Sequence, residues 1–462
     1  MKKLLFSSIT FFSCIFIANA QDPWTPSVTD GFGNVNNQIV KCMTPFKGDL
    51  YAGAADYAGE LYKSSTGNMG SWSLMFNAPY VSRIDALGTT TDGGGYIYLS
   101  AYASGSDVPK VYGSPDGTTW TNYYQASNAV SYIVPFKGTG AVDSVYLFED
   151  GPFGTIIHRS LFSTYDPLDT LGSWQTVLDF SIVEPYTLVT STLVSGGKLY
   201  IGTGSAELWS TTNGTVWTKN DSVANGFSNP NNMQITALGS FSGYIYAGTY
   251  NYSDGAQIWR SSDEIHWTMV QQYPAYDKIT AFAVAGGELW ATMHSNGSYA
   301  GAIVKSSDGI TFTISNSNGF GDANNQGDYG NMVVFGNNLY YGQRNYAYAA
   351  IAHPPTGGTR APALTTGGQI WRYCLGVPPT LSLGADHTIC SGTSVTLNAG
   401  AGASAYYWSN GATTQTTSVS APGNYFCTIT NAIGCSANDT VAVFNTPAPT
   451  ILLGNLPPAL CK

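Results

Sequence analysis

Carboxylates and histidines are the first side chains to consider for catalysis in this 462-residue chain. Four aspartates occupy corresponding places in repeated loops: Asp56, Asp107, Asp150 and Asp254. Glycoside hydrolysis needs two carboxyl groups roughly 5–10 Å apart across the bond, whereas carboxylates in polar loops are usually solvated. The 5 histidines are scattered without metal-ligand spacing, and no glycine-rich loop joins a strand to a helix. We therefore predict no catalytic residue, no metal and no cofactor.

The composition narrows the choice of partner. Charged residues make up only 10% of the chain, and its formal net charge is −10. Nucleic acids and anionic membranes require clustered cations, so we expect neither as a partner. Because 43% of the residues are hydrophobic and 13% aromatic, the chain can bury a sizeable core, which excludes general disorder.

Residues 1–20 have the features of a signal peptide. Lys2 and Lys3 precede an apolar run that ends before Ala18-Asn19-Ala20, a small-residue cleavage pattern. The run is shorter than the roughly 20 residues that a membrane span needs. We expect a secreted or cell-surface protein without membrane insertion after the signal is removed. In an oxidising compartment its cysteines are expected to form disulfides.

A repeated strand signature must position any functional residue. It consists of a β-branched residue or Leu, then an aromatic residue, then small residues. Its copies begin at Leu50, Ile97, Val145, Leu199, Ile245, Leu289 and Leu339. The spacing of 44 to 54 residues, in a sequence of short alternating strands, is typical of a propeller blade. We predict an all-β protein whose residues 21–376 form a seven-bladed β-propeller, with four strands per blade named A to D from the axis outward.

The ends of the repeat predict how the ring closes. Trp24-Thr25, followed by Gly31-Phe32, repeats a pattern found after the outermost strand of other copies, whereas the seventh copy ends after its third strand. The N-terminal strand should therefore complete the last blade and remove an exposed edge. Cys42 and Cys374 either bridge this closure or remain two buried thiols, since a bridge requires Cα atoms within about 7 Å.

The turn between strands C and D has the most specific motif. It places Asp116, Asp263 and Asp308 after a serine and before an aromatic residue, in a compact Ser-x-Asp-Gly-x-x-Trp form. The motif resembles the Asp-box, or BNR, repeat of sialidase-like propellers. We expect the carboxylate to accept turn amides, a structural role, with a calcium or substrate site as the alternative. A sialidase would also need an Arg-Ile-Pro motif, and the nearest match, Arg83-Ile84-Asp85, lacks the proline.

Residues 377–445 have the pattern of a second domain. Short alternating strands, a central Trp408 and a late Gly-x-Tyr strand match an immunoglobulin-like β-sandwich. The segment resembles the Ig-like or PKD-like modules of large secreted bacterial surface proteins, and that resemblance implies a Cys390–Cys435 disulfide. The partner of Cys427 stays open. Residues 446–462 are predicted to be a linker and the start of a second, truncated module, in which the partner of Cys461 is also open.

The loops on the side of the propeller opposite the aspartate turns are rich in Tyr and Asn. Such side chains suit sugar rings or peptide edges, although scattered exposed aromatics are also normal on soluble surfaces. The candidate ligand-binding residues are Tyr57, Tyr102, Tyr252, His294, Arg344 and Tyr346. We predict a non-catalytic bacterial recognition protein that binds a glycan or a surface protein. The alternatives are a sialidase-like or other glycan-active hydrolase and a purely structural surface module.

Overall fold

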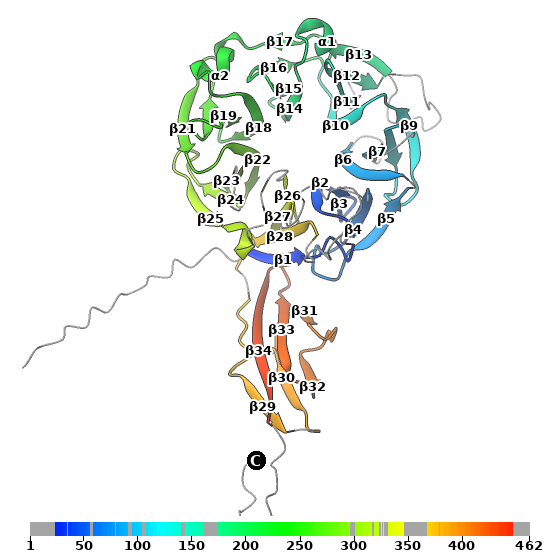
Figure 1. The fold of residues 1–462 in the computed structure, drawn as a ribbon, viewed down its shortest axis with the longest axis vertical. Coiled ribbons are helices and arrows are strands. Elements are labelled where there is room, and N and C mark those ends of the chain that lie inside the picture. Colours follow the sequence, from blue (N-terminus) through cyan, green and yellow to red (C-terminus); the bar gives the residue numbers. More distant parts are fainter. Residues whose placement is uncertain are drawn as a thin grey trace, which may run out of the picture.

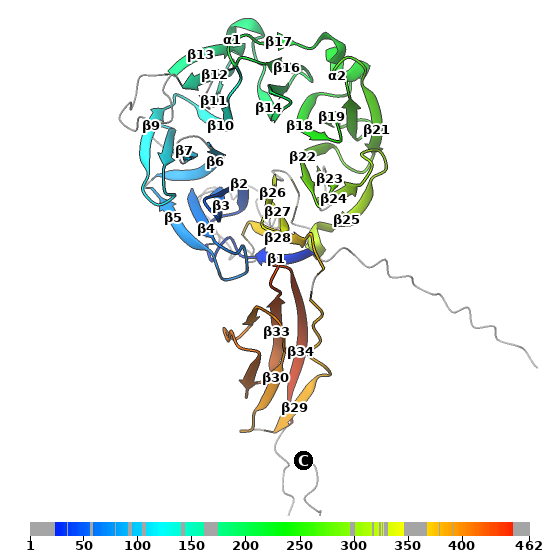
Figure 2. The same cartoon turned by 180° about the vertical axis from the view of Figure 1, so that it is seen from behind.

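A computed structural model describes residues 24–446, except for 35, 56–58, 79, 91–94, 104–107, 140–143, 161–173, 296–300, 317, 323–324, 326, 328–330, 346–366, 378 and 391. The predicted signal peptide and the predicted start of a second module therefore lie outside the described residues. The described chain forms a ring of antiparallel sheets and a separate elongated domain that leaves the rim of the ring (Figures 1 and 2).

The ring is a β-propeller whose successive strand groups run from the axis outward. In order they are β2 (Ile39–Phe46), β3 (Asp49–Ala55), β4 (Glu60–Ser64) and β5 (Ser73–Asn77); β6 (Val81–Thr89), β7 (Ile97–Ala103), β8 (Lys110–Ser114) and β9 (Thr121–Gln125); β10 (Ala129–Phe136), β11 (Ser144–Gly151), β12 (Gly154–Ser160) and β13 (Trp174–Asp179); β14 (Val189–Ser195), β15 (Lys198–Thr203), β16 (Leu208–Thr211) and β17 (Thr218–Lys219); β18 (Gln234–Phe241), β19 (Tyr244–Tyr250), β20 (Ala256–Ser261) and β21 (Thr268–Tyr273); β22 (Lys278–Ala285), β23 (Glu288–His294), β24 (Ala302–Ser306) and β25 (Thr313–Asn316); and β26 (Asn331–Phe335), β27 (Asn338–Gln343), β28 (Gln369–Cys374) and β1 (Trp24–Val28).

The N-terminal strand closes the ring, as the repeat pattern predicts. β1 pairs antiparallel with β28, so that Trp24 lies opposite Tyr373. The Trp24 indole nitrogen donates to Ser315 Oγ at 2.9 Å, and its ring contacts those of Trp290 and Phe320 at 5.9 and 5.5 Å. The first described strand is thus held by aromatic contacts to the neighbouring sheet as well as by its own ladder.

The glycine of the strand signature is required by packing between neighbouring sheets. A Cβ on Gly53 would lie 2.8 Å from Ile84 Cγ2, and one on Gly248 would lie 2.5 Å from the Cβ of Ile279. Both isoleucines are fully buried on the innermost strand of the next group. Only a residue without a side chain leaves room for them.

The signature tyrosine reaches the C–D turn of the next sheet. Tyr246 donates its hydroxyl hydrogen to the carbonyl of Gly309 at 3.1 Å, and Tyr340 donates to the carbonyl of Thr66 at 3.1 Å. Both rings are fully buried. The Leu-Tyr-x-Gly pattern therefore encodes contacts between blades, which explains its recurrence.

Short helical turns lie in the D–A connections. They are α1 (Phe180–Val183), η2 (Asp221–Val223), α2 (Ala224–Ser228) and η3 (Asn318–Gly321). Phe32, Phe227 and Phe320 have positive φ and stack on Tyr62, Trp259 and Trp371, with interplanar angles of 5°, 8° and 5°. Within the described part of the chain, no helix is long and apolar enough to cross a membrane.

The C-terminal domain has two sheets around one core. One sheet has the order β29 (His387–Cys390), β34 (Ser436–Thr446), β33 (Gly423–Thr430) and β31 (Ala405–Trp408), and the other pairs β30 (Val395–Asn398) with β32 (Thr416–Val419). Trp408 is fully buried and belongs to the same apolar cluster as Leu397 and Val419 of the smaller sheet and Val441 of the larger one. The two sheets therefore share a single hydrophobic core.

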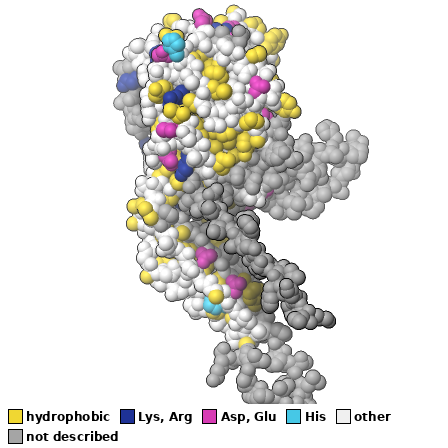
Figure 3. Space-filling model, turned by 90° about the vertical axis from the view of Figure 1, so that its left-hand side faces the viewer, with side chains coloured by type: hydrophobic (Ala, Val, Ile, Leu, Met, Phe, Trp, Pro, Cys, Tyr) yellow, Lys and Arg dark blue, Asp and Glu magenta, His cyan; other side chains and the backbone are white. Residues whose placement is uncertain are grey.

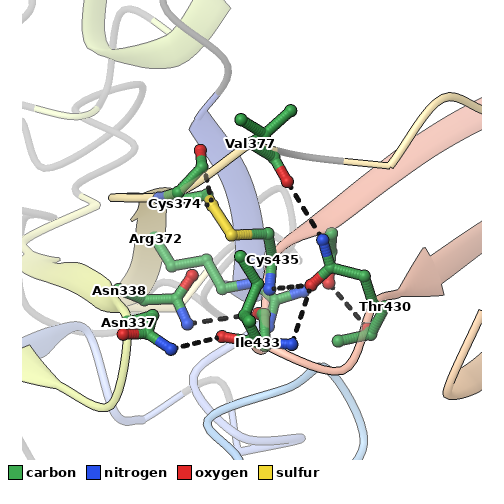
Figure 4. Close-up of a disulfide and its surroundings, with 12 residues drawn as sticks. Asn337, Asn338, Arg372, Cys374, Val377, Thr430, Ile433 and Cys435 are labelled. Atoms are coloured by element: carbon green, nitrogen blue, oxygen red, sulfur yellow. Dashed lines mark hydrogen bonds between the residues drawn. A yellow bond between two sulfur atoms is a disulfide. The ribbon is translucent and has the colours of Figure 1, made fainter.

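A disulfide between Cys374 and Cys435 joins this domain to the ring, with Cα atoms 5.1 Å apart (Figure 4). Asn337 and Asn338, at the start of β27, donate their side-chain amides to the carbonyls of Ile433 and Gly434 at 2.9 and 3.2 Å. The turn that precedes β34 is thus attached directly to the propeller rim.

This disulfide corrects the predicted Cys390–Cys435 pairing and excludes the Cys42–Cys374 bridge that the sequence left open. Cys390 lies opposite Thr446, at the far end of the 11-residue strand that Cys435 precedes. At about 3.3 Å per residue that separation is roughly 35 Å, far beyond bridging distance. Cys42 is a free thiol whose Sγ contacts the carbonyl of Ile84 on β6 at 3.7 Å, so Cys374 instead bonds across the domain junction.

Candidate functional site

Six innermost strands have a β-bulge near the end that follows the D–A connection. In β2, β10, β14, β18 and β22 the pairing register shifts around one residue near the start of the strand, and in β6 it shifts at both Ser82 and Asp85. A bulge turns a side chain away from the regular alternation. One bulged residue from each of these six strands lines a central cavity of about 700 Å³: Lys41, Asp85, Ser131, Thr190, Thr236 and Thr280.

Hydroxyl groups in this ring connect neighbouring sheets. Thr190 Oγ1 donates to the carbonyl of Ile235 at 2.7 Å, and Thr236 Oγ1 donates to the carbonyl of Ile279 at 2.6 Å. Each hydroxyl has then used its hydrogen and retains oxygen lone pairs as acceptors. The cavity wall therefore presents fixed hydrogen-bond acceptors to any ligand inside it.

Charged side chains on one side of the cavity largely neutralise one another. Asp85, whose side chain is 2% exposed, forms ion pairs with Lys41 and with Arg83 Nε, the latter at 3.0 Å. Burial raises the pKa of Asp150 above its ordinary value, and Thr155 Oγ1, which donates to Asp150 Oδ1 at 2.7 Å, partly offsets this effect. On the outer edge of the ring, Figure 3 shows charged side chains scattered among uncharged polar and hydrophobic ones. The cavity is polar without a strong charge of either sign.

Four of the predicted binding residues lie on B–C loops or strand ends of the same side. Tyr102 lies in β7 with the Arg83 guanidinium 4.0 Å from its ring centre. Tyr252 is 64% exposed in the β19–β20 turn. His294 is the last residue of β23, and its Nδ1 lies 2.8 Å from Asp277 Oδ1. Arg344 follows β27 and forms an isolated backbone β-bridge with Ile39. Tyr57 and Tyr346 lie outside the described residues.

These four residues share a side of the propeller, but Tyr102, His294 and Arg344 each contact a different neighbour, and Tyr252 is exposed. The cavity wall consists of other residues, on the innermost strands. The bulged residues of the cavity wall have a sequence pattern. In several copies of the repeat a β-branched apolar residue directly precedes the polar bulged residue, as in Val40-Lys41, Ile84-Asp85 and Ile279-Thr280. The apolar neighbours make these segments resemble regular buried strands, and sequence alone does not reveal a bulge.

The three aspartates of the C–D turns accept backbone amides on the opposite side. Asp308 Oδ1 accepts the amides of Ile310 and Thr311 at 2.8 and 2.7 Å. Asp116 does the same with Thr118 and Thr119, as Asp263 does with Ile265 and His266. Hydrogen bonds from these turns hold the pKa of all three carboxyls well below the ordinary range. Each aspartate therefore satisfies backbone amides of its own turn.

Of the loop aspartates considered for catalysis, Asp254 has a comparable structural role. Its Oδ2 accepts the side-chain amides of Asn231, Asn229 and Asn251, which lower its pKa. Asp56 and Asp107 lie outside the described residues. Asp150 lies in β11 and not in a loop as predicted, and it lines the central cavity.

No protein-family model and no curated protein matches this sequence. Three solved structures are similar in fold. The GH74 xyloglucanase from Xanthomonas campestris is 15% identical, with a TM-score of 0.49 over 70% of this chain and 52% of that one, so this chain spans about half its length. YCF48 bound to D1 peptide is 11% identical (TM-score 0.47, 79% and 98% of the two chains), and BamB from Moraxella catarrhalis is 10% identical (0.41, 76% and 98%). Because these TM-scores are below 0.5, the likenesses carry no argument about function.

Proposed function

We propose that this chain is an exported, non-catalytic recognition protein that binds a glycan or a surface protein through the side of the propeller bearing the D–A and B–C loops. The observation that carries this proposal is the central cavity of about 700 Å³, lined by the bulged residues of six inner strands. Cavities of this size with a few fixed polar groups are typical ligand sites. The disulfide supports export, because such bonds persist in oxidising compartments.

We further propose a seven-bladed ring of Asp-box type followed by an Ig-like module. The order of the strand groups, the amide-binding aspartate turns and the buried Trp408 support these assignments. In this arrangement the module acts as a spacer, fixed to the rim through Cys435, and the recognition side remains accessible.

Binding measurements on the full chain test the recognition role. Gln234 and Lys278 line the cavity at the start of β18 and β22. We expect Gln234→Ala and Lys278→Ala to weaken the binding of a captured glycan or protein about tenfold or more. Asp308→Asn, on the opposite side, should lower stability but leave the affinity of the folded protein unchanged. The opposite pattern of losses, or no ligand in a broad glycan and surface-protein screen, would favour the purely structural alternative.

A glycan-active hydrolase is the second candidate, and Asp150 favours it. A partly buried carboxyl with a raised pKa is suited to donate a proton, and the ion-paired Asp85 lines the same cavity. Sugar release from a polysaccharide panel would support this function if Asp150→Asn abolished release but preserved binding. Binding without release supports recognition alone.

A further inference from the structure

Two tyrosines in D–A connections combine an unusual backbone with high exposure. Tyr80 precedes β6 and Tyr186 precedes β14; their φ angles are 67° and 70°, and their side chains are 75% and 74% exposed. A bulky residue with positive φ is uncommon and costs free energy. Phe227 has a similar φ, but its ring is buried against Trp259. At Tyr80 and Tyr186 the same backbone state instead presents an aromatic ring to solvent.

Both tyrosines adjoin the binding side described above. Leu188, two residues after Tyr186, lines the central cavity, and β6, which begins directly after Tyr80, contributes Asp85 to it. The Tyr186 ring lies edge-on to Phe153 at 5.9 Å, and its amide donates to the Phe153 carbonyl at 2.7 Å. Tyr80 borders a smaller cavity of about 220 Å³. Each ring is thus positioned by the loop that leads into a cavity-lining strand.

We propose that Tyr80 and Tyr186 are stacking platforms for the sugar rings of a neutral polysaccharide whose middle part occupies the central cavity. This inference rests on the proposed recognition function and specifies its ligand class. Exposed aromatic faces match the apolar faces of sugars, while the hydroxyl-lined cavity matches their hydroxyl groups.

Charge and strand geometry favour a neutral glycan over other ligands. Lys41 is paired with Asp85, and Lys278 and Asp150 add one charge of each sign to the lining, so the cavity has no excess of positive charge to attract an acidic polymer. A peptide added as an extra strand needs a regular edge, whereas bulges interrupt six of the inner strands near the cavity. Exposed Ile182 and Val183 beside Tyr186 make an apolar peptide the alternative to be separated by experiment.

Calorimetric titration of the full chain tests the proposal. The probes are a soluble β-glucan, a mannan and a galactan, with polygalacturonate as the acidic polymer and unfolded casein peptides as the protein alternative. We expect Tyr80→Ala and Tyr186→Ala each to weaken neutral polysaccharide binding about tenfold or more. Tyr80→Phe and Tyr186→Phe should retain binding, as should Ile265→Ala on the opposite side. Tyr186→Gly should also lose affinity with an unchanged or raised melting temperature, since glycine adopts positive φ freely.

Three results would overturn the inference. If Gln234→Ala and Lys278→Ala weaken neutral polysaccharide binding but the tyrosine variants do not, the platforms are wrong and the proposed function stands. If only polygalacturonate or only casein peptides bind, the ligand class is wrong. If none of the probes binds, this inference is overturned while a folded-protein partner for the proposed function is still to be tested by the surface-protein screen.

Discussion

Glu264 shows how one residue can replace the turn glycine that neighbouring blades use. It occupies the position after Asp263 where other copies have glycine, and its φ is 64°. Its carboxylate accepts hydrogen bonds from Lys198 Nζ at 2.9 Å and the Tyr200 hydroxyl at 2.7 Å. These bonds join two sheets and offset the cost of a left-handed backbone in a residue with a Cβ. The turn motif thus links neighbouring blades both where it contains glycine and where it contains glutamate.

Gly309→Ala should lower the free energy of unfolding by about 2 kcal/mol or more. Alanine would have to adopt the positive φ of 69° found at Gly309, and its Cβ would lie 2.0 Å from the Tyr246 hydroxyl oxygen. Gly287→Ala is the matched control, because its φ is 78° with no atom within 4 Å of the new Cβ; we expect a loss of about 1 kcal/mol there. Equal losses in denaturant unfolding would mean that the tyrosine contact contributes nothing.

Acid should destabilise the propeller through its turn aspartates. In the folded state the pKa values of Asp116, Asp263 and Asp308 are lowered by amides and, first of all at Asp263, by His266. Their stabilisation is therefore complete above the unfolded pKa of about 4 and is lost as the pH falls below it. Unfolding by urea between pH 7 and pH 3 should show a smaller decrease for Asp308→Asn than for the parent chain. Identical slopes would contradict this assignment.

At the scale of elements, closure by β1 is the feature on which the ring depends. Removing residues 22–28 would leave β28 as an unpaired outer edge and would remove the Trp24 ring from its contacts with Trp290 and Phe320. Unpaired edges promote aggregation. The deletion should therefore lower the melting temperature and produce oligomers in size-exclusion chromatography with light scattering. A monomer that melts like the parent chain would mean that β1 does not close the ring.

The sequence could predict strands and turns well because each is set by local rules. Signature tyrosines and glycines recur where one sheet packs on the next, and aspartate turns satisfy their own amides. The bulges were missed because they arise from pairing between strands, although polar residues such as Lys41 and Thr280 lay within apolar segments. The sequence also predicts that Tyr102, Tyr252, His294 and Arg344 share one side of the ring, but it does not predict the residues that line the cavity.

At the scale of the whole molecule, the domain junction is where the resemblance to Ig-like modules misled. Pairing Cys390 with Cys435 assumed a bridge within one module, whereas Cys435 faces the propeller. Only the orientation of the module on the rim decides between these pairings, and no local pattern encodes it. The disulfide therefore cross-links the last blade of the propeller to the C-terminal domain.

Loss of this bridge should loosen the junction. The disulfide spans 61 residues, for which chain-entropy estimates give about 4 kcal/mol. We expect Cys374→Ala with Cys435→Ala to lower the unfolding free energy of the C-terminal domain by about this amount, more than the control Cys427→Ala. Non-reducing peptide mapping should recover the Cys374–Cys435 pair from the parent chain, and an unbridged Cys374 would contradict the junction.

Hydrogen exchange of the full chain, with and without a polysaccharide or protein ligand captured in a binding screen, tests most directly which side of the propeller recognises a partner. We predict ligand-dependent protection in the D–A connections and at the starts of β6, β14, β18 and β22, around the central cavity. The C–D turns containing Asp116, Asp263 and Asp308 should exchange unchanged. Protection confined to those turns or to the C-terminal domain would contradict the assignment of the binding side.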